Sequence, residues 1–167
     1  TVGIVSPSSP VTNKGYSQRS IGVLKRLGFN VILGKNALRY LGYMAGTAKE
    51  RVEDLHDMFA NPEVKAIFTS AGGFVSHQLL RYLDYDLIRK NPKIICGFSD
   101  LTTLLNALFK KTGLITFYNF SIERFNSNAS DFTIKSFMDM LVSDEQPVFL
   151  PHKSRWKVIR KVKAEGR

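Results

Sequence analysis

Short apolar runs alternate with helical patterns along nearly the whole chain, and this alternation constrains the fold more than any other feature. The runs predict strands, because they are rich in β-branched residues and are closed by turn formers; they begin at residues 2, 31, 64, 93 and 114. Apolar residues at helical spacing lie between or after them, in the segments 17–30, 47–59, 77–83, 84–91, 101–113 and 131–143. Strands that alternate with helices predict a parallel sheet with helices on both faces.

We therefore expect an α/β domain with an open, mainly parallel sheet of the Rossmann-like or flavodoxin-like kind. In such sheets, ligands bind beyond the carboxyl ends of the strands. Three loops of small and polar residues follow predicted strands and should share that edge: 6–10 (SPSSP), 70–76 (SAGGFVS) and 97–100 (GFSD). The edge formed by these three loops is called the rim below.

Length and composition exclude several classes of protein. The chain has 167 residues, which is enough to bury a core, and its hydrophobic content of 44% and charged content of 23% are ordinary for a globular domain. No apolar run approaches the ~20 residues of a membrane span, and no signal peptide is visible, so we expect no membrane partner. The three histidines, His56, His77 and His152, lack the spacing of metal ligands, so we expect no metal or cofactor.

The chain is basic, with a net charge of +10, and six of the 14 residues 154–167 are Lys or Arg. A basic chain can bind nucleic acid or a phosphate-bearing ligand, but a solvated surface with a charged tail explains the excess as well. Because no nucleic-acid-binding signature is present, we expect no nucleic-acid partner. The single cysteine, Cys96, cannot form an internal disulfide, which favours a reducing compartment.

Ser99 stands where an apolar strand meets a helical pattern, two residues after Gly97. A tight, strained turn there would expose its hydroxyl, and the following N–H groups would face an anion, as in the nucleophile elbow of hydrolases. The usual elbow has a second glycine two residues after the serine, where this chain has Leu101. On local sequence, Ser99 can equally be a helix N-cap that accepts from the N–H of Thr102.

The neighbours of Ser99 also allow two interpretations. Gly72 and Gly73 can serve only as a tight turn, or their N–H groups can face the serine and bind an oxyanion. Asp100 follows the serine directly, and we expect its side chain to point into the helix N-terminus.

The segment 71–108, AGGFVSHQLLRYLDYDLIRKNPKIICGFSDLTTLLNAL, resembles the LD-carboxypeptidases (muramoyltetrapeptide carboxypeptidases), a family of serine peptidases. Three features of the family occur in order. They are a loop with two glycines (the GG loop, 70–76), an S-x-x-L-L-x-x-L-D stretch and a G-[FY]-S-D-[ILV]-T motif. The segments GIVSPSSP and AGTAKERVEDLHDMF are also similar to the family. The sequences LDYDLI and NPKIICGFSD are most similar to the branch of the microcin C self-immunity peptidases.

The resemblance implies that Ser99 is the nucleophile and that the N–H groups of Asp100 and of Gly72 or Gly73 form the oxyanion hole. Three residues are implied to contact the substrate: Ser76, Tyr118 and Asn119. The family usually has Gly-Pro after the aromatic residue that corresponds to Tyr118, where this chain has Asn119-Phe120, so the wall of the pocket should differ there.

The resemblance implies a cytoplasmic, homodimeric serine carboxypeptidase of peptidoglycan recycling that hydrolyses an LD peptide bond. Its substrate would be a murein tetrapeptide, which becomes a tripeptide and D-alanine. The alternative substrate is a peptidyl-nucleotide of the microcin C type, with a role in microcin immunity. A third interpretation is a non-catalytic domain that holds a carboxylate or phosphate at a helix N-terminus.

The catalytic Glu and His of the family lie in a C-terminal domain. We therefore expect residues 1–150 to form the N-terminal α/β domain that carries the nucleophile, and 151–167 to be a basic linker towards a C-terminal domain that is missing. The chain begins with a predicted strand and has no initiator Met, so we expect it to be part of a longer protein. His77 follows the GG loop and is the best local candidate for a base, although the polarity of a helix start explains it equally well.

Overall fold

A computed structural model of the chain describes residues 1–11, 14–118, 120–122, 125 and 129–143. Contacts between Cα atoms divide the chain into two compact units, Thr1–Asp131 and Phe132–Arg167, and each unit is described by itself. The expected domain boundary at residue 150 lies outside the described residues and stays a prediction.

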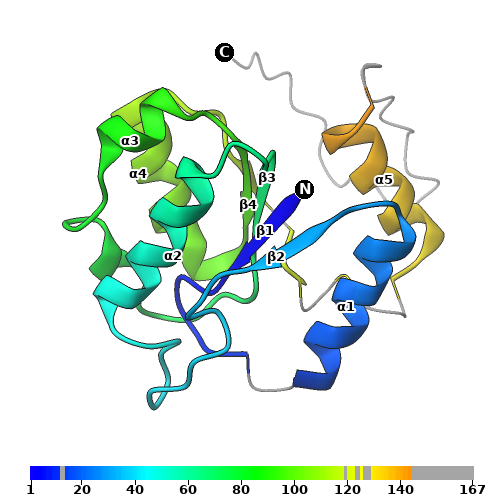
Figure 1. Cartoon of the computed structure of the whole chain (residues 1–167), viewed down its shortest axis with the longest axis horizontal. Helices are drawn as coiled ribbons and strands as arrows, with labels where there is room; N and C mark the ends of the chain where they lie inside the picture. Colours follow the sequence, from blue (N-terminus) through cyan, green and yellow to red (C-terminus); the bar gives the residue numbers. More distant parts are fainter. Residues whose placement is uncertain (12–13, 119, 123–124, 126–128, 144–167) are drawn as a thin grey trace, which may run out of the picture. The chain divides into compact units, whose positions relative to one another are not determined.

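The first unit is built on a five-stranded sheet with the order β2-β1-β3-β4-β5 (Figure 1). All neighbouring strands run parallel, which confirms the predicted α/β class. The strands are β1 (Val2–Val5), β2 (Val31–Leu33), β3 (Ala66–Thr69), β4 (Ile94–Gly97) and β5 (Phe117–Tyr118). This order is that of flavodoxin-like sheets, in which the winding direction reverses between β1 and β3 and ligands bind at that reversal.

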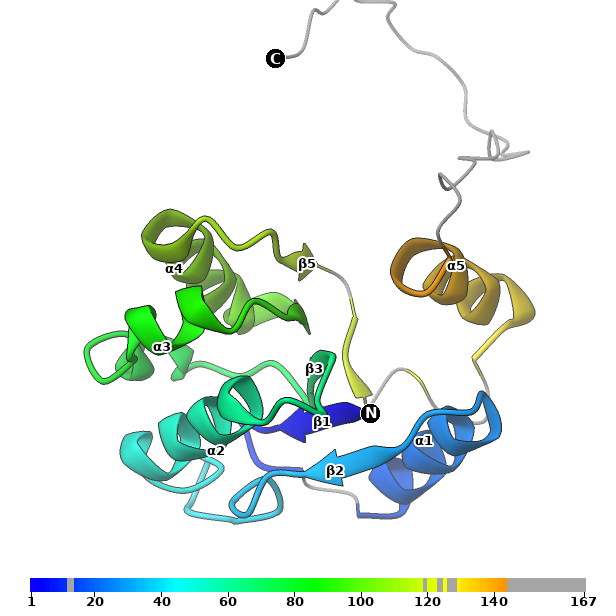
Figure 2. The ribbon, with the colours of Figure 1, turned by 45° about the horizontal axis from the view of Figure 1, so that its top comes forward.

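Helices cover both faces of the sheet, as expected from the apolar strands. Figures 1 and 2 show α1 on one face and α2, α3 and α4 side by side on the other. The helices of the first unit are α1 (Lys14–Arg26), α2 (Ala48–Ala60), α3 (Tyr85–Lys90) and α4 (Thr102–Thr112), and the 3-10 turns η1 (Ser76–Leu79) and η2 (Ser99–Leu101) precede α3 and α4. The second unit contains most of α5 (Asp131–Leu141).

Local signals in the sequence explain where the helices begin and end. A capping box starts α2, because Thr47 accepts from the N–H of Glu50 while the Glu50 carboxylate accepts from the N–H of Thr47. Gly113 ends α4 with φ +77°, a left-handed conformation that suits glycine. The helix expected at 77–83 is only the short turn η1, because Asp84 starts α3 as its N-cap soon afterwards.

The core lies between the sheet and the layer of α2, α3 and α4. Its fully buried members include Leu55 and Phe59 of α2, Ile67 of β3, Ile95 of β4 and Leu104 of α4. Cys96, the neighbour of Ile95 on β4, is not part of this cluster but is also buried, and burial raises the pKa of its thiol to about 12. Within the described ranges, no helix is both long and apolar enough to cross a bilayer.

We predict that Leu104→Ala lowers the free energy of unfolding by about 2–5 kcal/mol, because it leaves a cavity in a closed part of the core. The exposed residue Lys110 of the same helix provides the control, and Lys110→Ala should change that free energy by less than about 0.5 kcal/mol. Urea denaturation followed by circular dichroism measures both changes. Equal, small effects of the two substitutions would contradict the described packing of α4.

Candidate active site

Ser99 occupies a strained turn between β4 and α4. Its φ is +59°, and it is the one residue other than glycine with a positive φ in the described part of the chain. Such a conformation typically costs ~1–3 kcal/mol and persists where the surroundings enforce it. The side chain of Ser99 is exposed, so its hydroxyl is accessible from solvent. The expected strained serine between strand and helix is therefore confirmed.

The alternative interpretation of Ser99 as a helix N-cap is wrong. The side chain of Ser99 makes no capping hydrogen bond; instead, Thr102 Oγ1 donates to the carbonyl oxygen of Ser99 at 2.6 Å. Gly97 explains how the turn can be so tight, because a Cβ atom at that position would lie 2.9 Å from Cβ of Leu101. The glycine thus lets the first turn after β4 fold back closely on the strand.

The GG loop lies beside Ser99, because β3 and β4 are neighbours in the sheet. A Cβ atom at Gly72 would lie 2.9 Å from Cβ and 3.3 Å from Oγ of Ser99. Gly73 has φ +151°, and a Cβ atom there would meet the hydroxyls of Ser8 and Ser9. Both glycines are therefore needed for the close approach of this loop to the serine and to the loop after β1.

Three backbone N–H groups of the GG loop and the elbow are candidate oxyanion donors. Those of Gly72, Gly73 and Asp100 have no hydrogen-bond acceptor within the described residues. Donors placed around a serine can bind the negative oxygen that forms when the hydroxyl attacks a carbonyl group. Tyr118 also reaches this place, because its hydroxyl oxygen accepts from the N–H of Ser99 at 3.4 Å.

The carboxylate of Asp100 points to the neighbouring loops and not into its own helix, which corrects the expectation from sequence. Its Oδ2 accepts from Ser8 Oγ at 2.5 Å, from the N–H of Val75 at 3.0 Å and from the N–H of Ser76 at 2.9 Å. Burial alone raises the pKa of Asp100, but these hydrogen bonds outweigh it and hold the pKa below the ordinary value of a carboxyl group. Asp100 thereby joins the loop after β1 and the GG loop to the elbow.

One of the three expected substrate contacts, Ser76, is placed differently from the expectation. Ser76 is fully buried, and its hydroxyl donates to the carbonyl oxygen of Asp100 at 2.8 Å. A buried hydroxyl that is already bonded has no free surface for a substrate, so Ser76 supports the loop instead. Asn119 lies outside the described residues, whereas Tyr118 is exposed next to Ser99.

No base contacts the Ser99 hydroxyl in the described part of the chain. His56 Nε2 accepts from the N–H of Asp84 at 2.9 Å, and burial lowers the pKa of this histidine although nearby carboxylates oppose the shift. His77 is exposed on η1 and has no hydrogen bond to the serine. His152 lies outside the described residues. The same described ranges hold no group of three His, Cys, Asp or Glu side chains that could bind a metal ion.

Sequence reasoning missed Ser8 and Arg51, which contact the same loops. Arg51 is fully buried in α2, and its guanidinium reaches the carbonyl oxygens of Pro7 and Val75. A signal existed for Arg51, since it lies four residues before Leu55 on the apolar stripe of its helix. No comparable local signal marks Ser8.

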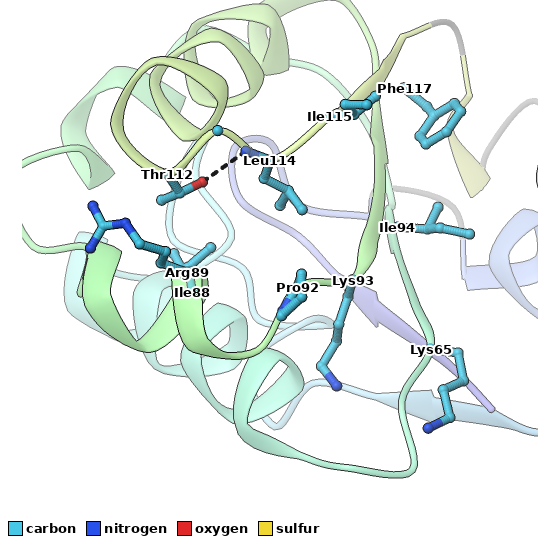
Figure 3. Close-up of a pocket in the computed structure, with 11 residues that line it drawn as sticks. Lys65, Ile88, Arg89, Pro92, Lys93, Ile94, Thr112, Leu114, Ile115 and Phe117 are labelled. Carbon is cyan, nitrogen blue, oxygen red and sulfur yellow. Dashed lines mark hydrogen bonds between the residues drawn. The ribbon is translucent and has the colours of Figure 1, made fainter.

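A pocket of about 540 Å³ lies at the opposite edge of the sheet, near the amino ends of β4 and β5 (Figure 3). Its lining is largely apolar, with Ile94, Leu114 and Phe117, and includes the basic residues Lys65 and Lys93. The Lys93 ammonium already donates hydrogen bonds to the carbonyl oxygens of Asn61 and Val64. Because the strands separate this pocket from Ser99, it is not part of the candidate active site.

Comparison with known proteins agrees with this geometry. The sequence profile of the LD-carboxypeptidase N-terminal domain matches residues 2–119. The chain belongs to the LD-carboxypeptidase family. The family resemblance of the sequence is thus confirmed, and the matched region contains both the GG loop and Ser99.

Curated relatives carry names from both branches of the family. The putative carboxypeptidase YocD of Bacillus subtilis is 40% identical over 159 residues, which are 93% of this chain and 48% of the relative. The microcin C7 self-immunity protein MccF of Escherichia coli is 39% identical over 92% of this chain and 47% of its own. The probable murein peptide carboxypeptidase of Bacillus subtilis is 43% identical over 71% of this chain and 37% of its own. The chain therefore spans about half the length of the first two relatives.

Solved structures confirm the fold. MccF in complex with aspartyl sulfamoyl adenosine superposes with a TM-score of 0.84 at 38% identity, covering 90% of this chain and 47% of that one. A muramoyltetrapeptide carboxypeptidase from Oxalobacter formigenes gives a TM-score of 0.77 at 30% identity, covering 85% of this chain and 48% of that one.

We predict that Gly73→Ala destabilises the domain by about 2–3 kcal/mol, because a Cβ atom meets Ser8 and Ser9 and the backbone is strained for alanine. Gly42 is a matched control, since its φ is also positive, +59°, but no atom lies within 4 Å of the added Cβ. Gly42→Ala should cost only about 1 kcal/mol. Urea denaturation measures both, and a Gly73→Ala effect no larger than that of Gly42→Ala would contradict the close contact of the two loops.

We predict that acid weakens the hold of Asp100 on the two loops. A carboxyl group whose folded-state pKa is lowered stabilises the fold fully above its unfolded pKa, and this contribution disappears as the pH falls through the folded pKa. Ser8→Ala removes one donor, so the pKa of Asp100 should rise towards its ordinary value. Carboxyl carbon chemical shifts in an NMR titration measure this pKa. Ser9→Ala, which removes a hydroxyl outside the donor set of Asp100, should leave it unchanged; an unchanged value in Ser8→Ala would refute the described bond.

Proposed function

We propose that this chain supplies the nucleophile and the oxyanion hole of a serine carboxypeptidase that cleaves an LD peptide bond. The substrate is a murein tetrapeptide, and the products are a tripeptide and D-alanine. The observation that carries the proposal is the exposed Ser99, held at φ +59° with Gly72 so close that a Cβ atom there would lie 2.9 Å from Cβ of the serine. This arrangement supports nucleophilic attack beside backbone donors.

In the proposed reaction, Ser99 Oγ attacks the carbonyl carbon of the bond that precedes the terminal D-alanine. The N–H groups of Asp100 and of Gly72 or Gly73 stabilise the oxyanion of the tetrahedral intermediate. A base must remove the seryl proton, and the described residues place none at the hydroxyl. We assign this base, and the carboxylate that orients it, to the half of the relatives' length that this chain does not span.

The exposed Tyr118 belongs to the proposed substrate pocket, together with Asn119. The hydroxyl of Tyr118 already accepts from the N–H of Ser99, so its own proton remains available to a substrate group. The proposal includes a homodimer that acts in the cytoplasm on peptides of peptidoglycan recycling.

Hydrolysis of a peptidyl-nucleotide in microcin immunity is the second candidate function. It is supported by the likeness to MccF structures, which include complexes with adenosine monophosphate and aspartyl sulfamoyl adenosine at 38% identity. The net charge of +10 suits an anionic peptide and a nucleotide equally and does not separate the two substrates.

The test uses the protein expressed from its complete open reading frame, with a murein tetrapeptide and aspartyl sulfamoyl adenosine as alternative substrates. We predict release of D-alanine from the tetrapeptide, and a fall of about 10⁴-fold or more in turnover for Ser99→Ala. Thr103→Ala changes an exposed residue of the following helix and should keep full activity. We also predict negligible turnover for residues 1–167 alone, because the described residues place no base at the serine.

Each other outcome has a defined meaning. Preferential release of aspartate from aspartyl sulfamoyl adenosine would select the second candidate function. Full activity of Ser99→Ala would eliminate the serine mechanism. If the complete protein binds the tetrapeptide but cleaves neither substrate and does not react with a fluorophosphonate probe, the domain binds anions without catalysis. Robust turnover by residues 1–167 would show that a local base, such as His77, completes the site.

A further inference from the structure

Arg51 is a buried cation without an ion pair in the described part of the chain. Its relative exposure is only 1%, and no carboxylate lies within 4.0 Å of its guanidinium there. The charge is instead surrounded by neutral oxygens. Nη1 donates to the carbonyl oxygens of Pro7 at 2.8 Å and Val75 at 3.2 Å, Nη2 to Gln78 Oε1 at 2.8 Å, and Nε to the carbonyl oxygen of Thr47 at 3.3 Å. Burying such a charge is costly unless its hydrogen bonds are satisfied.

The carbonyl groups that Arg51 holds belong to the two loops that Asp100 also holds. Val75 donates its N–H to the Asp100 carboxylate, while its carbonyl oxygen accepts from Arg51. In the loop after β1, the carbonyl of Pro7 accepts from Arg51, and the next residue, Ser8, donates its hydroxyl to Asp100. Each loop is therefore bonded to a cation and an anion within one or two residues.

We infer that Arg51 is a positioning residue for the proposed oxyanion hole. It fixes the carbonyl groups of Pro7 and Val75, and thereby keeps the GG loop at the distance from Ser99 that lets its N–H groups meet an oxyanion. Arg51 has no contact with Ser99 and therefore acts through the loop. This inference rests on the proposed function.

The shape of the arginine side chain suits this task. A guanidinium is planar, carries five N–H donors in a fixed arrangement and can bond several acceptors at once, whereas a lysine ammonium is a compact point charge. Burial lowers the pKa of Arg51 and the negative charge of Asp100 raises it, but an arginine remains protonated in either case. The opposite charges of Arg51 and Asp100 therefore persist at neutral pH, one at the carbonyl oxygen of Val75 and the other at its N–H.

Asp100 and Ser8 hold the GG loop at Val75 and Ser76, but the glycine part of the loop depends on its neighbours for its position. It contains two glycines, one with φ +151°, and the exposed Phe74. The N–H of Ser9 donates to the carbonyl oxygen of Gly72 at 3.1 Å, so the loop after β1 is the direct neighbour of the GG loop. When Arg51 holds Pro7, it therefore constrains the GG loop from both ends.

The test compares Arg51→Met with the wild type, both expressed from the complete open reading frame. We expect kcat for the proposed peptidase reaction to fall by roughly 10²-fold, the effect of a misplaced catalytic group, with KM changed by less than about threefold. We also expect hydrogen exchange of the peptide that contains residues 72–76 to quicken by about tenfold or more. Arg51→Lys should lose about tenfold in kcat, since its single nitrogen cannot bond all of these acceptors.

Two further variants serve as controls. Arg81→Met removes an exposed arginine that lies over the Tyr82 ring, and it should leave both kcat and the exchange of 72–76 unchanged. Gln78→Met removes the oxygen partner of Nη2 and leaves Met44 Sδ at 4.0 Å, so it should cause a smaller effect than Arg51→Met in the same direction. If Arg51→Met does not fold, Arg51→Lys and Gln78→Met decide the question.

A folded Arg51→Met with wild-type kcat, or with wild-type exchange in 72–76, would overturn the inference. So would a loss in which KM rises and kcat stays constant, because that pattern indicates weaker substrate binding and not a misplaced oxyanion hole. If the wild-type protein cleaves neither substrate, the proposed function fails by itself. The exchange of 72–76 in Arg51→Met and Arg81→Met then still determines whether Arg51 holds the loop.

Discussion

The close approach of the carboxyl ends of β3 and β4 is the constraint on which the candidate site depends. Neighbouring strands lie about 4.8 Å apart, so the segments that leave them compete for the same space. Gly72 has no side chain and can lie against Ser99, and Gly97 leaves room for Leu101 in the following turn. The serine then takes a left-handed backbone conformation in the space that remains. The two glycines and the strained serine thus depend on one another, because together they let two crowded segments pack without a clash.

The strain at Ser99 requires compensation from its surroundings. A positive φ outside glycine costs ~1–3 kcal/mol, whereas a hydrogen bond to a charged group contributes ~1.5–3 kcal/mol. The carboxylate of Asp100, the next residue, accepts three such bonds from two other loops. These bonds act against the strain, so the elbow is held by contacts with residues far away in the sequence. A rigid elbow of this kind keeps the nucleophile in place before any substrate arrives.

Features of the fold that depend on residues close together in the chain could be predicted from the sequence. The alternation of apolar runs and helical segments was enough to predict the parallel sheet, whereas Gly97 and Ser99 indicated the strained turn as one of two interpretations. The capping box of α2 followed from Thr47 and Glu50 alone. In each case the residues that decide the structure are neighbours along the chain, and their steric or hydrogen-bonding preference acts locally.

Contacts between distant residues were not predicted. Ser8 and Asp100 are 92 residues apart, so neither the direction of the carboxylate nor the burial of Ser76 has a local signal. Arg51 lies on the apolar stripe of α2, but a charged residue is normally assigned to a helix surface, and the two loops around it supply the acceptors that its burial requires. The short turn η1 belongs to the same class, because Asp100 holds its first residue and the residue before it.

The buried cysteine of β4 has a practical consequence for experiments on the rim. Cys96 is the only cysteine of the chain, it is inaccessible, and a thiol with a pKa of about 12 has almost no reactive thiolate at neutral pH. A maleimide reagent should therefore leave the native protein unlabelled. A cysteine placed at an exposed rim position, such as Phe74, would be the single site of attachment for a fluorophore, which could report on ligand arrival next to an unmodified serine.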